Sequence, residues 1–416
     1  FFQLTGNLFT SYDFNYDTQG KLTLVPLPVA SIFCFLGIAL LLRLEKHHFG
    51  MGVIFSVFIL MMLSIVVFSS EVGKPELAKF ILLVQFILPM FALVLGRLYL
   101  PPTSDYLKYE ALGLYVLLLI IPLEVIATYL RGSVLLSPYL YIFSLYQHLQ
   151  YLPIIFVSLY FLAIGAVSTN RNLKLLTLFI TPWMGVYLAA SLSLLAEILA
   201  IVASLVSFLV LRKSGKVKYI LSLLTLLWLS FSFYHSAVQE TSRYTHKFDS
   251  EQTKYIVKRP TIEKKVVKEL TFSEKVIQEL PNNLQHRFYY WEFYVKGAID
   301  SPKVFFFGNP TRPSRDTYPS AHNYYLDFIY SFGVVAVLPL FFLIFHTVKA
   351  AWLTLKTDTV SDSTVILLVL VMFYIFFDNF LKVGFRQPYP GMIMFFLWGL
   401  LLSRLPNPSL IKNKGI

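Results

Sequence analysis

Eleven apolar runs divide this sequence, and each is long enough to cross a bilayer as a helix, which takes about 20 residues. The runs do not alternate as barrel strands do, and a helix satisfies its own backbone hydrogen bonds inside a membrane. With 56% apolar and 14% charged residues, the chain is neither a soluble globule nor a disordered segment. The sequence therefore predicts an all-α polytopic membrane protein with eleven transmembrane helices. The runs lie at 25–44, 50–69, 79–100, 111–129, 150–168, 175–190, 191–211, 219–234, 324–347, 364–383 and 389–404.

Lysine and arginine in the short loops predict the orientation of these helices, because cytoplasmic loops are enriched in both residues. The chain opens with Phe1 rather than Met, so a preceding twelfth span is expected, which would place both ends of the full chain in the cytoplasm. The basic set of loops, assigned to the cytoplasm, contains Arg43, Lys46, Arg97, Lys108, Arg171, Lys174, Arg212, Lys213, Lys216 and Lys218. The opposite short loops carry only Lys74, Arg131, Lys382 and Arg386.

Three regions follow from this pattern: N-terminal membrane helices at 1–234, a large outer loop with short helices at 235–323, and C-terminal membrane helices at 324–416. The loop includes two helical stretches, Thr261–Leu280 and Leu284–Ile299. Residues 235–320 hold fourteen Lys or Arg against ten Asp or Glu. The orientation rule does not require positive charge on the outer face, so this excess indicates an anionic ligand there.

A His-Asn pair opens the ninth run, and a glycine follows eleven residues after the histidine. We expect His322 in the first turn of this helix, where the positive helix dipole keeps the imidazole neutral and available as a base. Eleven residues cover about three turns, so Gly333 is expected on the His322 face, where a neighbouring helix or a lipid can approach closely. In the structural alternative, His322 and Asn323 simply cap a helix at the membrane interface.

Arginines in the loop before this helix strengthen the functional interpretation. Arg312 and Arg315 lie in the outer loop, and the planar guanidinium fork suits a diphosphate. A neutral histidine beside such arginines is suited to deprotonate an acceptor hydroxyl while an anionic leaving group is held. The sequence has no phosphate-binding Gly-Lys-Ser/Thr loop, no paired-Cys site and no His-Glu-x-x-His helix, so no metal site, cofactor or nucleic-acid partner is predicted.

The His-Asn segment resembles the signature of the bacterial O-antigen polymerase and O-antigen ligase superfamily. That signature is a His-Asn or His-Ser pair followed by nine residues, a glycine, two more residues and a small residue. Here His322, Asn323 and Gly333 fit, and Ala336 stands where glycine is more usual.

Three further segments resemble the same superfamily, and the resemblance covers the chain from Arg287 to its C-terminus. Arg287-Phe-Tyr-Tyr-Trp291 is similar to an Arg-x-x-x-Trp helix of the family, and Phe307-Gly308 is similar to its Phe-Gly turn. Arg386, before the last run, resembles an outer-face arginine that is often found there.

The resemblance implies a type-C glycosyltransferase of the bacterial inner membrane whose active site faces the periplasm. It implies an undecaprenyl-diphosphate-linked oligosaccharide as donor, an acceptor glycolipid as partner, surrounding membrane lipids, and neither metal nor cofactor. His322 would activate the acceptor hydroxyl, Arg287 and Arg386 would neutralise the diphosphate, and Asn323, Gly333 and Trp291 would support them. A chain-length regulator is a further partner that the resemblance leaves open.

Polymerase and ligase share this donor and differ in their acceptor. Ligases of the family usually carry an Arg at the outer end of a middle span, whereas the corresponding stretch here, Ser191 to Glu197, has none. That departure favours a polymerase over a ligase that joins glycan to the lipid A core. Glu197 is interpreted either as a helix–helix polar contact or as a group that orients a donor-site arginine such as Arg131. A flippase or transporter of lipid-linked glycan is the third hypothesis, although no pair of matching broken spans supports it.

Other ionisable residues near the runs receive structural interpretations. Asp378 and Lys382 lie four residues apart, so a local ion pair is predicted. Asp327 lies five residues after His322, which is a poor helical spacing for orienting the imidazole directly.

Overall fold

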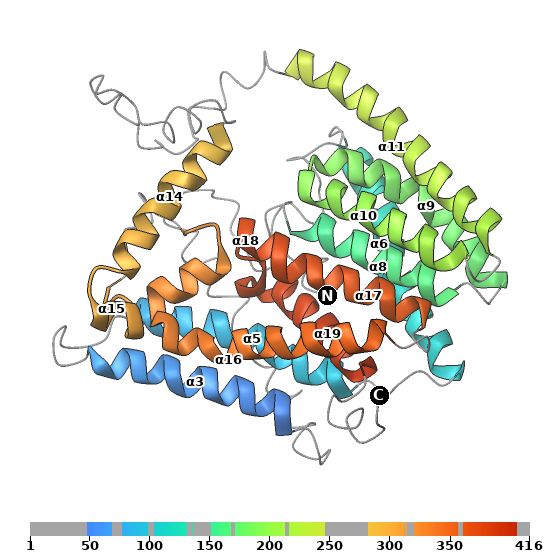
Figure 1. Cartoon of the computed structure of the whole chain (residues 1–416). Coiled ribbons are helices and arrows are strands. Elements are labelled where there is room, and N and C mark those ends of the chain that lie inside the picture. The colour runs from blue at the N-terminus through green and yellow to red at the C-terminus, as the bar shows by residue number, and fades with distance from the viewer. Residues whose placement is uncertain are drawn as a thin grey trace.

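In the computed structural model, every regular element among the described residues is helical, and no strand occurs in them (Figure 1). The coarse prediction of an all-α polytopic membrane protein is thereby confirmed. The structure describes residues 48–68, 77–98, 104–130, 135, 151–167, 171–212, 216–245, 282–311, 313, 320–356 and 361–405.

Ten of the eleven apolar runs coincide with helices, and the run at 25–44 lies outside the described residues, as does the expected helix at 261–280. Seven helices are long and apolar enough to cross a membrane, and the apolar helices 111–127, 152–166 and 390–404 are shorter. The N-terminal part contains α3 (His48–Val67), α5 (Leu77–Leu98), α6 (Ser104–Leu130), α8 (Leu152–Val167), α9 (Arg171–Ser191), α10 (Leu194–Leu211) and α11 (Val217–Thr245). The C-terminal part contains α14 (Asn282–Ala298), α15 (Pro302–Phe307), α16 (Tyr324–Leu355), α17 (Asp362–Phe373), α18 (Asn379–Leu381) and α19 (Pro388–Arg404).

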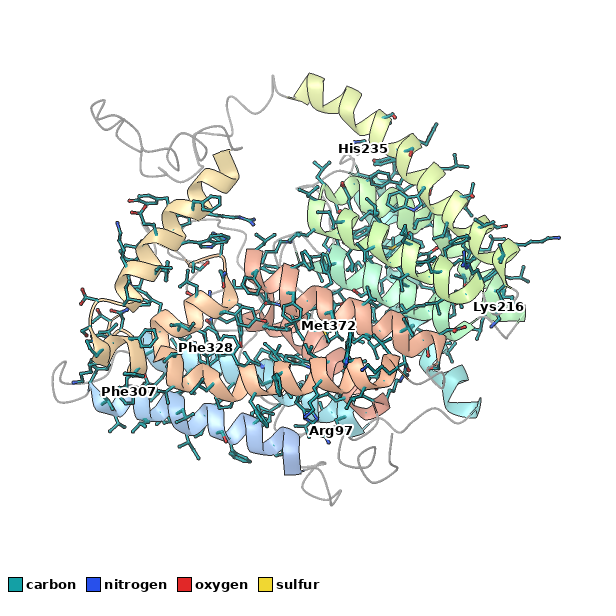
Figure 2. All side chains as sticks on the ribbon, in the orientation of Figure 1. Arg97, Lys216, His235, Phe307, Phe328 and Met372 are labelled. Carbon is teal, nitrogen blue, oxygen red and sulfur yellow. The ribbon has the colours of Figure 1, made fainter. Side chains whose placement is uncertain are left out.

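Small residues allow the helices to approach closely where the core is densest. At the crossing of α5 and α19, a Cβ added to Gly96 would lie 2.8 Å from the Leu400 nitrogen, and one added to Gly399 would meet the Leu93 carbonyl. Association inside a membrane depends on such van der Waals contact, because lipid tails are as apolar as the side chains. Figure 2 shows Arg97, at the end of α5, and Phe307, at the end of α15, at opposite ends of the layer formed by α3, α5 and α16.

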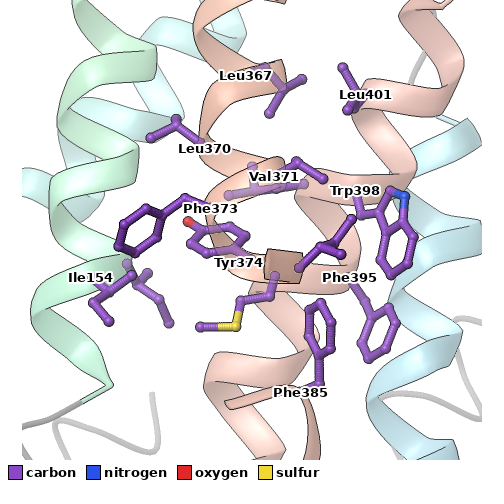
Figure 3. Close-up of a cluster of buried hydrophobic side chains, with 14 of the residues drawn as sticks. Ile154, Leu367, Leu370, Val371, Phe373, Tyr374, Phe385, Phe395, Trp398 and Leu401 are labelled. Carbon is purple, nitrogen blue, oxygen red and sulfur yellow. The ribbon is translucent and has the colours of Figure 1, made fainter. Parts of the chain in front are cut away.

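An aromatic cluster joins α19 to the loop that precedes it (Figure 3). The Phe385 ring stacks on Phe395 and Trp398 at centroid distances of 4.6 and 5.8 Å. The buried Trp398 indole donates a 2.9 Å hydrogen bond to the Thr347 hydroxyl on α16. This packing fixes Phe385, and therefore the neighbouring Arg386, against the helix core.

Helix α16 breaks at Gly333, whose φ of 80° and ψ of 169° are not helical. Tyr325 and Phe341 would lie about 24 Å apart along one straight helix of sixteen residues. Their rings instead stack with centroids 5.8 Å apart, so residues 324–332 turn back beside the rest of α16 (Figure 1). The run at 324–347 coincides with a helix long and apolar enough to cross a membrane, but the prediction that regular helical turns put Gly333 on the His322 face is wrong. We call residues 324–332 the re-entrant segment.

Helix α17 also departs from regular geometry at its end. A π-helical turn, Tyr374–Asp378, precedes α18, and a 3-10 turn follows at Gly384–Arg386. The buried Asn379 amide holds these turns together, because it donates to the Tyr374 carbonyl at 2.9 Å and accepts from the Phe385 N–H at 2.8 Å. Such π-helical turns occur frequently at functional sites. Here the turn carries Asp378 toward the start of α16.

Candidate functional site

His322 lies directly before the re-entrant segment, not in its first turn. Asn323 is the N-cap residue, and its side-chain oxygen accepts a 3.0 Å hydrogen bond from the Leu326 N–H. The expectation that His322 occupies the first helical turn is therefore wrong, because the cap falls one residue later. The backbone of His322 has a φ of 49°, and its N–H donates to the Ser320 hydroxyl at 3.2 Å. A left-handed conformation at a non-glycine residue stores strain and is commonest at functional sites.

Helix α14 places Tyr290 next to His322. The Tyr290 ring lies 5.8 Å from the half-buried imidazole, centroid to centroid, and Arg287 lies one turn earlier on α14. Burial lowers the pKa of the Arg287 guanidinium, whereas its interactions with Tyr151 and Asp378 act in the opposite direction. Arginine stays protonated in proteins, so the charge is present at neutral pH. The sequence prediction that Arg287 and His322 belong to one site is thus compatible with the geometry.

The end of α17 supplies a second cation and a carboxylate. The Lys382 ammonium lies 4.0 Å from the Asp378 carboxylate, and both side chains are almost fully buried, which confirms the predicted ion pair. Neither Asp378 oxygen has a hydrogen bond among the described residues. The Lys382 ammonium also lies 5.6 Å from the centre of the Tyr151 ring. The Lys382 carbonyl accepts the Tyr324 N–H at 3.0 Å, so this loop is joined to the start of the re-entrant segment.

Arg386 is held by a carboxylate. Its guanidinium forms an ion pair with Asp327, and the two side chains are only 10% and 4% exposed. The guanidinium carbon also lies 5.7 Å from the centre of the Phe86 ring. Asp327 thus binds Arg386, in agreement with the prediction that its spacing does not suit direct orientation of His322.

The structure therefore gathers three cations and two carboxylates around the start of α16, with a formal net charge of one positive. The two ion pairs are Lys382 with Asp378 and Arg386 with Asp327. Arg287 interacts electrostatically with Asp378 but forms no ion pair of its own among the described residues. We call these five residues and His322 the charged cluster. Its net positive charge favours an anionic ligand over a cationic one.

Other predicted site residues have different settings. Trp291 lies one turn after Arg287, its ring is packed edge-on against Phe288 at 5.3 Å, and its indole N–H is buried without a partner among the described residues. Glu197 lies in the first turn of α10, half-buried, and its carboxylate makes no ion pair or hydrogen bond with the described residues. Arg131, Arg312 and Arg315 lie outside the described residues.

Gly333 has a different role from the predicted one. A Cβ at this position would meet the Phe306 carbonyl of α15, so the close approach is made by a short helix of the outer loop. Gly308, with a φ of 78°, is its counterpart, since a Cβ there would lie 2.5 Å from the Phe332 nitrogen. The expectation of a close approach at Gly333 is confirmed, and its placement on the His322 face is not.

Sequence reasoning did not identify Tyr290 as a neighbour of His322, or Lys382 and Asp378 as neighbours of the start of α16. A signal existed for Lys382 and Asp378, because ionisable residues within apolar runs are costly and are usually functional. Tyr290 lies between Arg287 and Trp291, in a stretch already singled out. Among the described residues, no three His, Cys, Asp or Glu side chains gather in a way that could hold a metal ion.

A comparison with protein-family models, with curated proteins and with solved structures finds no match to this chain. The class of protein is therefore stated from the fold and the site alone. The protein is an all-helical polytopic membrane protein with a buried charged cluster where a re-entrant segment, an α14 guanidinium and the end of α17 meet.

Proposed function

We propose that this protein is a membrane glycosyltransferase that moves a glycan from an undecaprenyl-diphosphate donor to an acceptor sugar hydroxyl. The observation that carries the proposal is the position of His322, which lies against Tyr290, one helical turn after Arg287, and two residues before Tyr324, whose N–H binds the Lys382 carbonyl. A histidine can accept a proton near neutral pH, and the two cations suit a leaving diphosphate. The resemblance of the His-Asn, Arg-x-x-x-Trp and Phe-Gly segments to O-antigen polymerases and ligases supports the same assignment.

In this reaction the acceptor oxygen attacks the anomeric carbon of the donor sugar, and His322 takes the hydroxyl proton. The bond between the anomeric carbon and the diphosphate oxygen breaks, and undecaprenyl diphosphate leaves with the electron pair. Arg287 and Lys382 stabilise the negative charge that develops on that oxygen. Arg386 contributes less than the sequence alone suggests, because its guanidinium is hydrogen-bonded to Asp327, whereas the Lys382 ammonium lies 4.0 Å from Asp378 oxygens that make no hydrogen bond among the described residues.

The membrane topology belongs to the same proposal. With eleven spans in this chain and the most basic short loops in the cytoplasm, α14, α15 and the charged cluster face the periplasm of a bacterial inner membrane. The ends of α5 and α11 that carry Arg97 and Lys216 then face the cytoplasm (Figure 2). A donor lipid would reach the cluster from the outer leaflet.

We assign the acceptor to another lipid-linked repeat, which makes the protein a surface-polysaccharide polymerase. The alternative acceptor is the lipid A core, which would make it an O-antigen ligase. The lipopolysaccharide of a deletion strain separates the two. A core that retains one repeat but no long chains supports a polymerase, whereas a bare core with accumulated lipid-linked polymer supports a ligase.

Purified protein with a defined lipid-linked repeat tests the reaction itself. A new glycosidic bond, detected by mass spectrometry of the lipid-linked products, supports the glycosyltransferase. Movement of the repeat across a vesicle membrane without any new bond would support a transporter and contradict the proposal.

A further inference from the structure

Asn309 joins two helix ends that would otherwise present carbonyl groups without partners. The last carbonyls of a helix have no intrahelical donor, and Gly297 is among the last residues of α14. The break at Gly333 likewise leaves carbonyls of the re-entrant segment without the usual fourth-residue donor. The Asn309 amide donates to the Gly297 carbonyl at 3.0 Å and lies 3.4 Å from the Tyr330 carbonyl. Its backbone N–H donates to the same Tyr330 carbonyl at 2.7 Å.

The surrounding packing makes this junction the pivot between α14 and the re-entrant segment. The Tyr294 and Tyr330 rings meet edge-on at 4.7 Å, and a Cβ added to Gly297 would lie 2.5 Å from the Tyr330 ring. Gly308, next to Asn309, lies against the backbone of Ser331 and Phe332. The Ser64 hydroxyl of α3 donates to the Phe307 carbonyl, so α15 is also attached to the membrane helices.

We propose that Asn309 is a positioning residue that fixes the tilt of α14, and with it Arg287, relative to His322. The two ends of the re-entrant segment are held separately: Asn309 binds the Tyr330 carbonyl near the break, and the Lys382 carbonyl binds the Tyr324 N–H at the start. The Asn309 amide binds the Gly297 carbonyl near the C-terminal end of α14, and Gly297 lies ten residues after Arg287. The effect of Asn309 on catalysis rests on the proposed glycosyltransferase function, whereas its effect on the tilt of α14 does not.

The length of α14 makes the junction matter for the distant site. Ten helical residues span about 15 Å, so a tilt of about 10° at Gly297 moves Arg287 by about 2.6 Å. A misplacement of about 1 Å in a reacting geometry can cost about 100-fold in rate. The Tyr290 ring moves with Arg287, so its contact with His322 would change as well.

Asn309→Asp is the sharpest variant, because it keeps the size of the side chain and removes both amide donors. The distance between spin labels at Tyr289→Cys on α14 and Phe345→Cys on α16, in a Cys34→Ser background, reports the tilt without any activity; both positions are partly exposed. We expect a broadened or shifted distance distribution in Asn309→Asp. Thr311→Ala, an exposed position two residues away, is the matched control and should leave the distribution unchanged.

The kinetic arm uses the same variants without labels and the lipid-linked donor and acceptor. We expect kcat to fall about 10- to 100-fold in Asn309→Asp, with a smaller rise in the donor KM, because alignment rather than binding is lost.

If Asn309→Asp does not insert, Asn309→Ser, which retains one donor, should show an intermediate distance distribution and kcat. An unchanged distance distribution in a well-inserted variant, or an unchanged kcat, overturns the positioning role. A changed distribution in a protein whose wild type transfers no glycan would retain the junction and reject the glycosyltransferase.

Discussion

Tertiary folding brings two other elements, α14 and the loop with Lys382, to His322 and the segment that follows it. Tyr290 comes from α14, Asn323 caps the segment that follows, and the loop with Lys382 accepts the Tyr324 N–H. The residues differ in how firmly they are held. Arg386 has a buried carboxylate partner, whereas Arg287 is half-buried and forms no ion pair with the described residues. This difference separates a structural arginine from one suited to a ligand.

Arg287→Ala should raise the donor KM about 10- to 100-fold, because a charge-assisted bond to phosphate contributes roughly 1.5–3 kcal/mol. Arg287→Lys should lose less, since it keeps the charge and loses the planar fork. Steady-state transfer rates at varied donor concentration measure both. Lys296→Ala, an exposed cation on the same helix, is the control and should behave as wild type. Equal donor KM values for wild type and Arg287→Ala would contradict the diphosphate role.

Arg386→Ala should act mainly on stability. Removing one partner of a buried ion pair strands the other charge and costs about 3–5 kcal/mol. The double variant Asp327→Asn with Arg386→Gln removes both charges and should recover much of that loss. Thermal unfolding in detergent measures the difference between the two proteins. A stable Arg386→Ala protein with a greatly raised donor KM would instead make Arg386 a diphosphate ligand.

At the scale of elements, the apolar runs identified the helices, because continuous hydrophobicity of sufficient length has few other folded solutions in a membrane. The same continuity concealed the break at Gly333, since the sequence is apolar on both sides of it. The resemblance identified His322 and Arg287, but their meeting with Lys382 depends on the re-entrant segment. A fold-back of this kind depends on α15, whose docking no local pattern reveals.

Gly333→Ala and Gly308→Ala should each destabilise the docking of α15 on α16. Both positions have a positive φ, and an added Cβ would meet backbone atoms that cannot yield without moving a helix. We expect a loss of at least about 1–3 kcal/mol per substitution, measured as a lowered Tm of the detergent-solubilised protein. Gly113→Ala on α6 is the control, because no atom lies within 4 Å of the added Cβ. A glycine variant as stable as Gly113→Ala would show that the break does not need glycine.

For the whole molecule, the uneven distribution of Lys and Arg predicts one orientation in the membrane. In a Cys34→Ser background, Ile299→Cys at the end of α14 should react with a membrane-impermeant maleimide added to intact spheroplasts. Lys356→Cys at the end of α16 should react only after the membrane is opened. The reverse pattern would place the charged cluster toward the cytoplasm and contradict a periplasmic reaction.

The charged cluster also bears on how the whole molecule uses its positive charge. Loop cations anchor the helices, whereas the buried cations near His322 are largely matched by Asp327 and Asp378. A net charge of one positive there suits an anionic ligand whose negative charge increases when its diphosphate becomes the leaving group. This charge balance is the property that the proposed enzyme, with its diphosphate leaving group, requires.

The most direct measurement is glycan transfer by His322→Ala in purified, reconstituted form, with a defined undecaprenyl-diphosphate-linked repeat as donor and acceptor. We expect the wild-type protein to make longer lipid-linked glycan and to release undecaprenyl diphosphate. His322→Ala should bind the donor with nearly unchanged affinity and make no detectable product, because the base is gone while Arg287 and Lys382 remain. Product formation by His322→Ala at the wild-type rate would contradict the account.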